Sequence, residues 1–277
     1  MDRIKDAVPW LTPSERRIAE AVLDDPDIVA FGTVAQVATR SGSSGPTVLR
    51  FASKVGFDGF LELQQAVQGE IADQLRPATQ RIRERHNGDF LASALVADLE
   101  NVRRTLEGVD PDDFAAVVEL VADRRHRVFV ISSELSGAAG RVFAQQLDML
   151  RDGVVSIDGN APRVSQGMIG VEDGDVVLVF DLRRYERWVV RAARRADERG
   201  GYVVAVTDSR QSSLASVARI VVEVSARGVG PFDSAAGSLA LVHALVAAAA
   251  ARMRRSAAAR LDAIESEWLS GDDLSAE

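Results

Sequence analysis

Two short runs of apolar residues at helical spacing, separated by a turn, mark the N-terminal part of the chain. The first run follows Thr33 and consists of Val34, Val37 and Ala38. Gln36 stands three residues after Thr33, which is the spacing of a capping box that begins a helix. We therefore predict a helix that starts after Thr33 and buries one face.

The second run has an apolar face and an opposite polar face. Its apolar residues recur at i, i+3, i+4 and i+7, and they are Val48, Phe51, Ala52 and Val55. Ser44 is a typical N-cap, and Pro46 is tolerated because it falls in the first turn. The polar face carries Thr47, Arg50 and Lys54. The pattern predicts a second helix that presents these three side chains to solvent.

The turn between the two runs contains Gly42, and the second run ends at Gly56. Glycine adopts backbone angles that other residues avoid, so both positions favour a change in chain direction. Two short helices joined in this way are typical of a helix-turn-helix, in which the second helix presents polar side chains to the major groove of DNA. The same spacing also fits an ordinary helical hairpin with a solvated face.

Charge separates this segment from the rest of the chain. The protein has a formal net charge of -8, yet no Asp or Glu occurs between Asp27 and Asp58, where Arg40, Arg50 and Lys54 stand. A local cationic patch of this kind is what DNA phosphates select. The acidic remainder argues against a protein that coats nucleic acid along its whole surface.

Further helices complete an all-helical domain, which we predict for residues 1–75 with four or five helices. Thr12 and Glu15 form a second capping box, with Pro13 at the first helical position. After the predicted helix-turn-helix, another amphipathic helix is indicated by apolar residues at helical spacing: Phe60, Leu63, Val67 and Ile71.

Residues 76–88 are predicted to form a linker, because Pro77 breaks the preceding helix and Asn87-Gly88 favours a turn. The segment is rich in arginine, namely Arg76, Arg81, Arg83 and Arg85. These side chains either contact the DNA backbone beside the helix-turn-helix or lie on a solvated linker helix, and we favour the second.

From Phe90 onward, near-continuous runs of Val and Ile alternate with helical segments. Five such runs are predicted to be strands, at residues 128–131, 154–157, 176–180, 202–206 and 220–224. This alternation is typical of a parallel sheet covered by helices on both faces. For residues 89–277 we therefore predict an α/β three-layer domain with a mostly parallel, five-stranded sheet.

The alanine-rich stretch 235–253 approaches the length of a membrane span, but Gly237, Ser238 and His243 interrupt it. We predict a buried helix there, with no membrane association, and a candidate for self-association. A chain of 277 residues without cysteine has no disulfide framework, and its charged N-terminus does not predict a signal peptide. We expect a cytoplasmic protein of two domains. No cofactor or metal site is indicated, since His and Cys clusters are absent.

Ligands of parallel sheets bind beyond the carboxyl ends of the strands, next to helix N-termini. Three loops follow such strand ends, and their candidate ligand-binding residues are Ser132, Ser133, Ser136, Arg183, Arg184, Tyr185, Asp208 and Ser213. Hydroxyls and unpaired N–H groups at a helix start suit a phosphate, and Arg183 or Arg184 would clamp a phosphate or carboxylate. Alternatively, these arginines are surface residues or pair with Asp181 and Glu186.

The pattern over residues 44–60, Ser-x-x-Thr-Val-x-Arg-Phe-x-x-Lys-x-Gly-Phe-x-Gly-Phe, resembles the N-terminal domain of the RpiR/MurR family of bacterial transcriptional regulators. Leu11-Thr12-x-x-Glu15 and Val34-Ala35-x-Val37-Ala38 fit the same pattern. The resemblance implies a DNA-binding role for the cationic helical segment.

The second domain is similar to the sugar isomerase (SIS) domain, which these regulators carry after the helix-turn-helix. The similar segments are residues 174–177, 207–209, 213–215 and 232–234. The resemblance implies a dimer and a phosphorylated sugar or related metabolite that alters DNA binding. Ser132 and Glu134 depart from the family, because they occupy glycine positions of the first loop, and Glu134 there would crowd and repel a phosphate. The second loop, residues 181–186, lacks the usual serines.

We therefore predict a sequence-specific, DNA-binding transcriptional regulator. The residues predicted at DNA are Ser44, Thr47, Arg50 and Lys54. Its partners would be a double-stranded DNA operator, a small anionic metabolite (a sugar phosphate or sugar acid), and a second copy of the chain in a dimer or higher oligomer.

Two alternatives stay open from the sequence. A SIS-type sugar phosphate isomerase would use Glu134 or Glu186 as a base. A metabolite sensor of another class would use the helical domain to dock a protein partner. No histidine stands at the carboxyl end of a predicted strand, so no catalytic residue is assigned.

Overall fold

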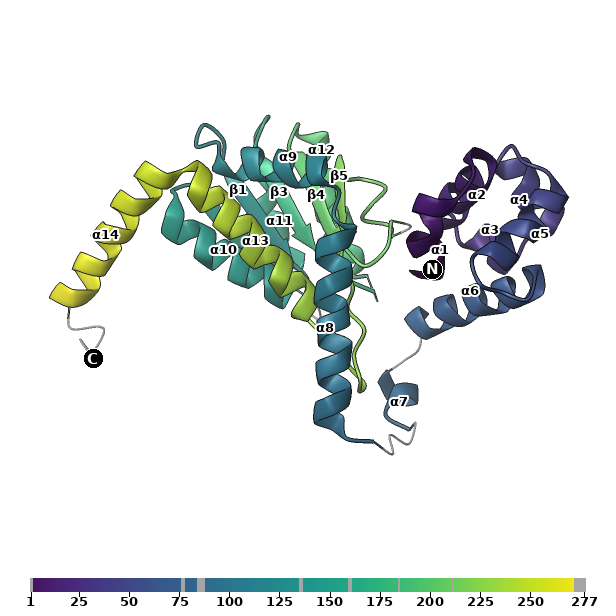
Figure 1. Ribbon diagram of the computed structural model, residues 1–277. Coiled ribbons are helices and arrows are strands. Elements are labelled where there is room, and N and C mark those ends of the chain that lie inside the picture. Colours follow the sequence, from purple (N-terminus) through teal and green to yellow (C-terminus); the bar gives the residue numbers. More distant parts are fainter. Residues whose placement is uncertain are drawn as a thin grey trace. The chain divides into compact units, whose positions relative to one another are not determined.

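The computed structural model of the protein describes residues 2–75, 78–83, 88–134, 137–158, 161–183, 185–210 and 212–271. The chain forms two compact units, residues 1–77 and 78–277 (Figure 1). The linker prediction depends on Pro77 and on the Asn87-Gly88 pair. Residues 77 and 87 lie outside the described ranges. The described stretch 78–83 belongs to the second unit.

The first unit is all helical, as predicted. Its elements are α1 (Asp2–Ala7), a 3-10 turn η1 (Val8–Trp10), α2 (Pro13–Asp24), α3 (Asp27–Ala30), α4 (Val34–Arg40), α5 (Gly45–Lys54) and α6 (Phe60–Leu75). The prediction of four or five helices was wrong in number, because α1 and α3 are too short to show a helical period in the sequence. Ile4 of α1 and Val29 of α3 are fully buried, so both short helices contribute to the core.

The local signals around α4 and α5 are confirmed. Thr33 and Gln36 form the capping box of α4, and the N–H of Gln36 donates to Thr33 Oγ1 at 3.3 Å. Gly42 adopts a φ of 57° in the turn between the two helices. After α5, the N–H of Phe57 donates to the carbonyl of Ala52 at 3.0 Å. The four apolar residues of α5 named above are at most 4% exposed, so this face is fixed in the core.

The second unit contains a five-stranded sheet in the order β2-β1-β3-β4-β5, and every pair is parallel. Its strands are β1 (Val128–Ser132), β2 (Val154–Ile157), β3 (Val176–Phe180), β4 (Tyr202–Thr207) and β5 (Ile220–Glu223). Its helices are α7 (Ala78–Arg81), α8 (Phe90–Gly108), α9 (Pro111–Ala122), α10 (Ala138–Leu150), α11 (Ala161–Met168), α12 (Arg187–Glu198), α13 (Ala236–Arg252) and α14 (Arg254–Ser270). The predicted strand positions are confirmed, and turns follow Ser212 between β4 and β5.

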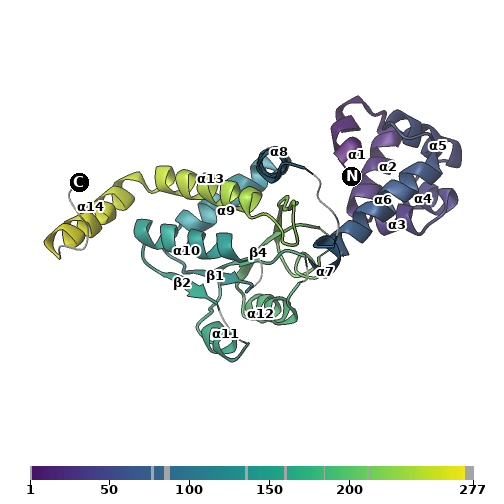
Figure 2. The same ribbon diagram turned by 90° about the horizontal axis from the view of Figure 1, so that it is seen from below.

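Helices cover both faces of the sheet (Figure 2). Along β3, Val177 and Val179 face a core formed with α11 and α12, while Val176 and Leu178 face a core formed with α9, α10 and α13. Alternate residues of a strand point to opposite faces, so an uninterrupted apolar strand is buried on both sides. The predicted three-layer architecture is confirmed.

The alanine-rich stretch forms the core helix α13. Its residues Leu241, Val242 and Leu245 are at most 1% exposed, and it packs against α8, α9 and α10. No single helix in the described part of the chain is long and apolar enough to cross a membrane, and α13 and α14 are bent by 105° where they meet. The apolar face of α13 is therefore used inside the unit.

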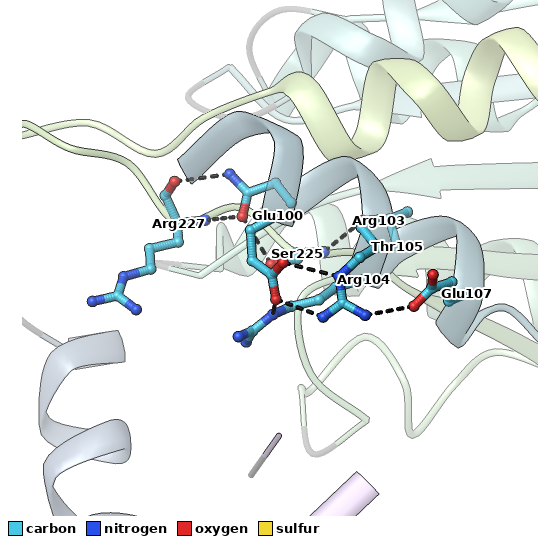
Figure 3. Close-up of polar contacts among 8 residues, drawn as sticks. Glu100, Arg103, Arg104, Thr105, Glu107, Ser225 and Arg227 are labelled. Atoms are coloured by element: carbon cyan, nitrogen blue, oxygen red, sulfur yellow. Dashed lines mark hydrogen bonds and ion pairs between the residues drawn. The ribbon is translucent and has the colours of Figure 1, made fainter. Parts of the chain in front are cut away.

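The segment that follows β5 is tied to α8 by polar side chains (Figure 3). Asn101 and Thr105 of α8 are each 1% exposed. Asn101 donates to the carbonyl of Arg227 at 2.8 Å and accepts from its N–H at 3.0 Å. Thr105 Oγ1 accepts from the N–H of Ser225 at 2.9 Å. These bonds satisfy buried polar groups on both elements and fix the path from β5 towards α13.

Candidate functional site

Three of the four residues predicted at DNA lie together along α5. Ser44 Oγ lies 2.8 Å from Thr47 Oγ1, and Arg50 donates to Thr47 Oγ1 at 3.2 Å. Ser44 and Arg50 are exposed, and Thr47 is half-buried. Hydroxyl and guanidinium groups donate to phosphate oxygens and to base edges. We refer to these three side chains as the α5 ridge.

Lys54 is placed differently from the α5 ridge. Its ammonium lies 2.7 Å from Glu15 Oε2, and Glu15 is only 8% exposed. The hydrogen bond from Lys54, followed by the one from the N–H of Thr12, lowers the pKa of Glu15 to about 2. Lys54 therefore joins the end of α5 to the start of α2. Its role at DNA stays a prediction, and its role in the fold was not foreseen from the sequence.

Two further arginines bond the turn and the end of the helix-turn-helix. Arg17 of α2 donates to the carbonyl oxygens of Ser41 and Gly42 at 3.3 and 3.2 Å. Arg3 of α1 donates to the carbonyl of Gly56 at 2.9 Å. Sequence reasoning missed both arginines, because their partners are 24 or more residues away and no local period links them.

In the second unit, buried polar side chains gather at the carboxyl edge of the sheet. Ser132 ends β1, Asp181 follows β3 and Thr207 ends β4, and each is at most 1% exposed. The strand order places these three positions side by side. Within the described ranges, Ser132 Oγ, Asp181 Oδ1 and Thr207 Oγ1 have no hydrogen-bond partner. Unpaired buried polar atoms are costly, so this edge is suited to a polar ligand.

Burial also changes the protonation of the acidic groups at this edge. It raises the pKa of Asp181 to about 7, with a smaller contribution from the Glu186 charge. It raises the pKa of Asp208 as well, although Asp208 accepts hydrogen bonds from Tyr185 Oη at 2.8 Å and from the N–H of Arg183 at 2.9 Å. Burial likewise raises the pKa of Tyr185. Protonated carboxyls repel an anion less than ionised ones, so the edge favours anions most at low pH.

Arg183 brings a positive charge to the same edge. Its NH2 lies 2.6 Å from Asp233 Oδ1 and donates to the carbonyl of Ala226 at 3.4 Å. Its carboxylate partner is therefore Asp233, not Asp181 or Glu186 as considered from the sequence. The same Asp233 oxygen accepts from Arg81 of α7 at 2.8 Å. Sequence reasoning missed Asp233 as a partner, although it lies in the segment 232–234, which is similar to SIS domains.

The carboxylate of Glu186, in the second loop, accepts a hydrogen bond from the backbone of the first loop. Glu186 accepts from the backbone N–H of Glu134 at 2.9 Å and from the indole N–H of Trp188. The side chain of Glu134 is exposed. The backbone N–H at this glycine position of the family pattern is thus already bonded to a carboxylate from within the chain.

The remaining predicted ligand residues divide into three groups. Ser133 is fully buried, and its N–H donates to the carbonyl of Phe180 at 3.0 Å. Ser213 is exposed, whereas its neighbour Ser212 is buried. Ser136 and Arg184 lie outside the described residues. The structure thus brings Arg183, Tyr185 and Asp208 into direct contact, alongside Ser132 and Ser133 at the ends of the strands.

Two family profiles match the chain. The profile described as "Helix-turn-helix domain, rpiR family" matches residues 1–74, and the one described as "SIS domain" matches residues 121–248. The chain belongs to the RpiR/MurR family of transcriptional regulators. This RpiR/MurR chain is accordingly a DNA-binding regulator with a SIS domain.

Relatives of this RpiR/MurR chain are named regulators as well. HexR of Pseudomonas aeruginosa, an HTH-type transcriptional regulator, is 24% identical over 230 residues, which cover 81% of this chain and 78% of HexR. HexR of Escherichia coli is 24% identical over 225 residues, which cover 78% of this chain and 76% of that relative.

Solved structures agree with the fold. The sugar isomerase domain of an RpiR transcription factor from Sphaerobacter thermophilus is 28% identical, with a TM-score of 0.59, over 64% of this chain and 99% of that one. The Vibrio vulnificus NanR protein, complexed with ManNAc-6P, is 19% identical, with a TM-score of 0.56, over 97% of both chains. The second comparison shows that this chain and NanR share a fold over nearly their full length.

Proposed function

We propose that this RpiR/MurR regulator binds a specific DNA operator through the α5 ridge, and that a sugar phosphate or related sugar acid binds at the carboxyl ends of β1, β3 and β4. Binding of this effector changes the affinity for the operator. The observation that carries the proposal is Arg183. It follows β3 at the edge where β1 and β4 end in Ser132 and Thr207, whose buried hydroxyls have no partner within the described ranges. NanR is complexed with a sugar phosphate in its structure, which supports the same ligand class.

The edge combines features that a phosphorylated sugar needs. A guanidinium binds phosphate or carboxylate with two parallel hydrogen bonds. Ser132 and Thr207 offer hydroxyls for the sugar, and the carboxyls of Asp181 and Asp208 accept from sugar hydroxyls when ionised. The ligand therefore has an anionic end and several hydroxyl groups.

Selection of genomic DNA on the pure protein tests the proposal. Sequencing the retained fragments defines the operator, and gel retardation then measures its affinity with and without a panel of sugar phosphates and sugar acids. We expect one class of compound to change operator affinity in the wild type and not in Arg183→Ala. If no fragment is enriched over random DNA, the helical unit docks a protein instead. If Arg183→Ala responds like the wild type, the effector site is wrong.

We further propose that the protein acts as a dimer, formed through the apolar side of α8. Leu91, Leu95 and Leu99 recur every four residues on one side of this helix, and they are 84%, 61% and 62% exposed. A contiguous exposed apolar surface marks an interaction site. A second copy of the chain is the partner that fits, since one helix-turn-helix reads only a half-site and α8 directly follows the segment that leads from the DNA-binding unit.

Substitutions in this stripe test the dimer. The double variant Leu95→Glu, Leu99→Glu is expected to sediment as a monomer and to lose roughly a hundredfold in operator affinity, because two half-sites are no longer bound together. Leu269→Glu, on an equally exposed leucine of α14, is the control and leaves both properties unchanged. A variant of α8 that stays dimeric would locate the interface elsewhere.

The isomerase alternative has one observation in its favour. Asp181 is buried and has a pKa of about 7, which suits proton transfer at neutral pH. Glu186, considered as a base from the sequence, is engaged by Glu134 and Trp188 and serves the loop structure. We propose that the protein is a cytoplasmic regulator without catalytic activity. Interconversion of aldose and ketose phosphates by the full chain, abolished in Asp181→Asn, would overturn that view.

A further inference from the structure

Arg81 reaches the proposed effector site from the stretch that connects the two units. It ends the short helix α7, and its NH1 donates to Asp233 Oδ1 at 2.8 Å, across 152 residues of sequence. Its side chain is 14% exposed, so it is largely enclosed by the second unit. Of the two roles considered for the linker arginines, DNA backbone contact or a solvated helix, neither describes Arg81.

Asp233 stands between two guanidinium groups. Arg183 and Arg81 contact the same oxygen, Oδ1, at 2.6 and 2.8 Å. The side chains of this cluster are at most 19% exposed. One carboxylate oxygen is shared by two guanidinium groups, and Asp208, which accepts from the N–H of Arg183, is a second acidic group near Arg183. An anion would give the two guanidinium groups a further acceptor.

The unused donors of the cluster match such an anion. The Nε atoms of Arg81 and Arg183 are buried and have no hydrogen-bond partner within the described ranges. An arginine N–H forms a charge-assisted hydrogen bond with a phosphate or carboxylate oxygen. In Arg183, NH2 is already engaged by Asp233 and Ala226, so Nε is a separate donor. Each arginine thus keeps a donor for an anion while another of its N–H groups remains on Asp233.

We propose that Arg81 is a second effector-binding residue, and that the anionic group of the effector is held between Arg81 and Arg183. This inference rests on the proposed function, because it assigns the effector to the same strand edge. It adds a ligand contact from the segment that leads to the DNA-binding unit. Occupancy of the site then fixes α7 on the second unit, which is a direct route from effector to operator binding.

The surroundings of Asp233 favour a fixed position for this carboxylate and a movable position for Arg81. Ser234, the next residue, donates through its hydroxyl to Asp98 of α8. The acidic side of the cluster is thereby anchored on a long helix, as is the segment at Arg227 (Figure 3). Arg81, by contrast, belongs to a helix of four residues. An anion bound in the cluster therefore affects the position of α7 more than the position of Asp233.

Titration calorimetry of the full chain tests the inference, with inorganic phosphate and glucose 6-phosphate as probes of the shared anion chemistry. We expect Arg81→Ala to weaken binding roughly tenfold or more, as loss of a charge-assisted hydrogen bond does. Asp233→Asn removes the competing carboxylate and tightens binding. Arg83→Ala, an exposed arginine two residues further on, is the matched control and binds like the wild type.

Hydrogen exchange of residues 78–83 gives the second readout. Phosphate is expected to slow exchange there in the wild type and in Arg83→Ala, and to have no effect in Arg81→Ala. If Arg81→Ala speeds exchange but binds phosphate as tightly as the wild type, Arg81 only docks the segment and the inference is wrong. If Arg183→Ala also binds like the wild type, the effector site itself is misplaced and the proposed function fails with it.

Discussion

Arg50 and Arg183 are both predicted from the sequence to meet an anion, yet their surroundings are opposite. Arg50 is exposed, and it donates a hydrogen bond to the hydroxyl of Thr47. Arg183 is 16% exposed and is held by the carboxylate of Asp233, which it shares with Arg81. Arg50 needs little rearrangement to meet a partner, whereas Arg183 must bind the ligand while it still donates to Asp233.

Under the proposed function, this difference separates a surface that reads DNA from a site that senses a metabolite. A rigid DNA duplex needs donors that are already exposed and correctly spaced, so that binding costs little reorganisation. A small metabolite can alter the protein only if its binding replaces or adds contacts that differ between two states. The cluster around Asp233 offers such contacts, and the α5 ridge does not.

The largest expected effect in this comparison is on the pH dependence of stability, at Asp181 in the buried site. Its folded pKa of about 7 lies above the ordinary value of 3.8, so the folded state favours the protonated form. The contribution of Asp181 to the free energy of unfolding is therefore full below about pH 4 and is lost as pH rises through 7. Asp181→Asn removes this loss, and we expect the variant to be about 3 kcal/mol more stable than the wild type at pH 8 and nearly equal at pH 4.

Denaturant unfolding of the full chain at the two pH values measures this effect, followed by hydrogen exchange of β3. Asp262→Asn, on an exposed residue of α14, is the matched control for the loss of one carboxylate. A difference between wild type and Asp181→Asn that is the same at pH 4 and pH 8 would mean that Asp181 is not protonated in the folded protein.

Arg50→Ala is the next largest change, on the exposed side of the comparison. Loss of one arginine contact to a base or phosphate costs about 1–3 kcal/mol, so operator affinity should fall roughly tenfold to a hundredfold while the melting temperature is unchanged. Fluorescence anisotropy on the selected operator measures it. Arg194→Ala, which removes an exposed arginine from α12 of the other unit, is the matched control for net charge. Equal losses in the two variants would remove Arg50 from the interface.

Local patterns in the sequence predicted the elements and the side chains that line the exposed face of α5. Capping boxes and the apolar period located α2, α4 and α5, and the alternation of strands and helices predicted the parallel sheet. The α5 ridge follows from the same period, because Ser44, Thr47 and Arg50 are three residues apart on one helix. The carboxyl edge of the sheet was predicted as well, since it follows from topology alone.

The partners of the charged residues were not predicted, because they depend on packing between distant segments. Arg81 and Asp233 are 152 residues apart, and Lys54 and Glu15 are 39 residues apart. No period within one helix contains such contacts. Asp181 was considered only as a partner for arginine, because the burial that raises its pKa comes from the surrounding strands and helices.

The smallest expected effect concerns Lys54, which the sequence placed on the polar face of α5 and the structure pairs with Glu15. The pKa of Glu15 is lowered from 4.5 to about 2, so its contribution to stability is present above pH 4.5 and is lost as pH falls towards 2. Because Lys54 is 38% exposed and solvent screens the pair, we expect Lys54→Met to cost about 1 kcal/mol at pH 7 and almost nothing at pH 2.

Hydrogen exchange of α2 and α5 in the full chain measures this loss of stability, and anisotropy measures operator affinity in parallel. We expect Lys54→Met to bind the operator within about twofold of the wild type, because its charge is already balanced by a partly buried carboxylate. Glu15→Gln is the matched variant. We expect it to lose the same stability at pH 7 and to release the ammonium of Lys54 from its ion pair. If Lys54→Met weakens operator binding as much as Arg50→Ala, the ammonium leaves Glu15 for DNA. In that case an internal ion pair on α5 would be exchanged for DNA, whereas the arginines at Asp233 keep their carboxylate when an anion binds.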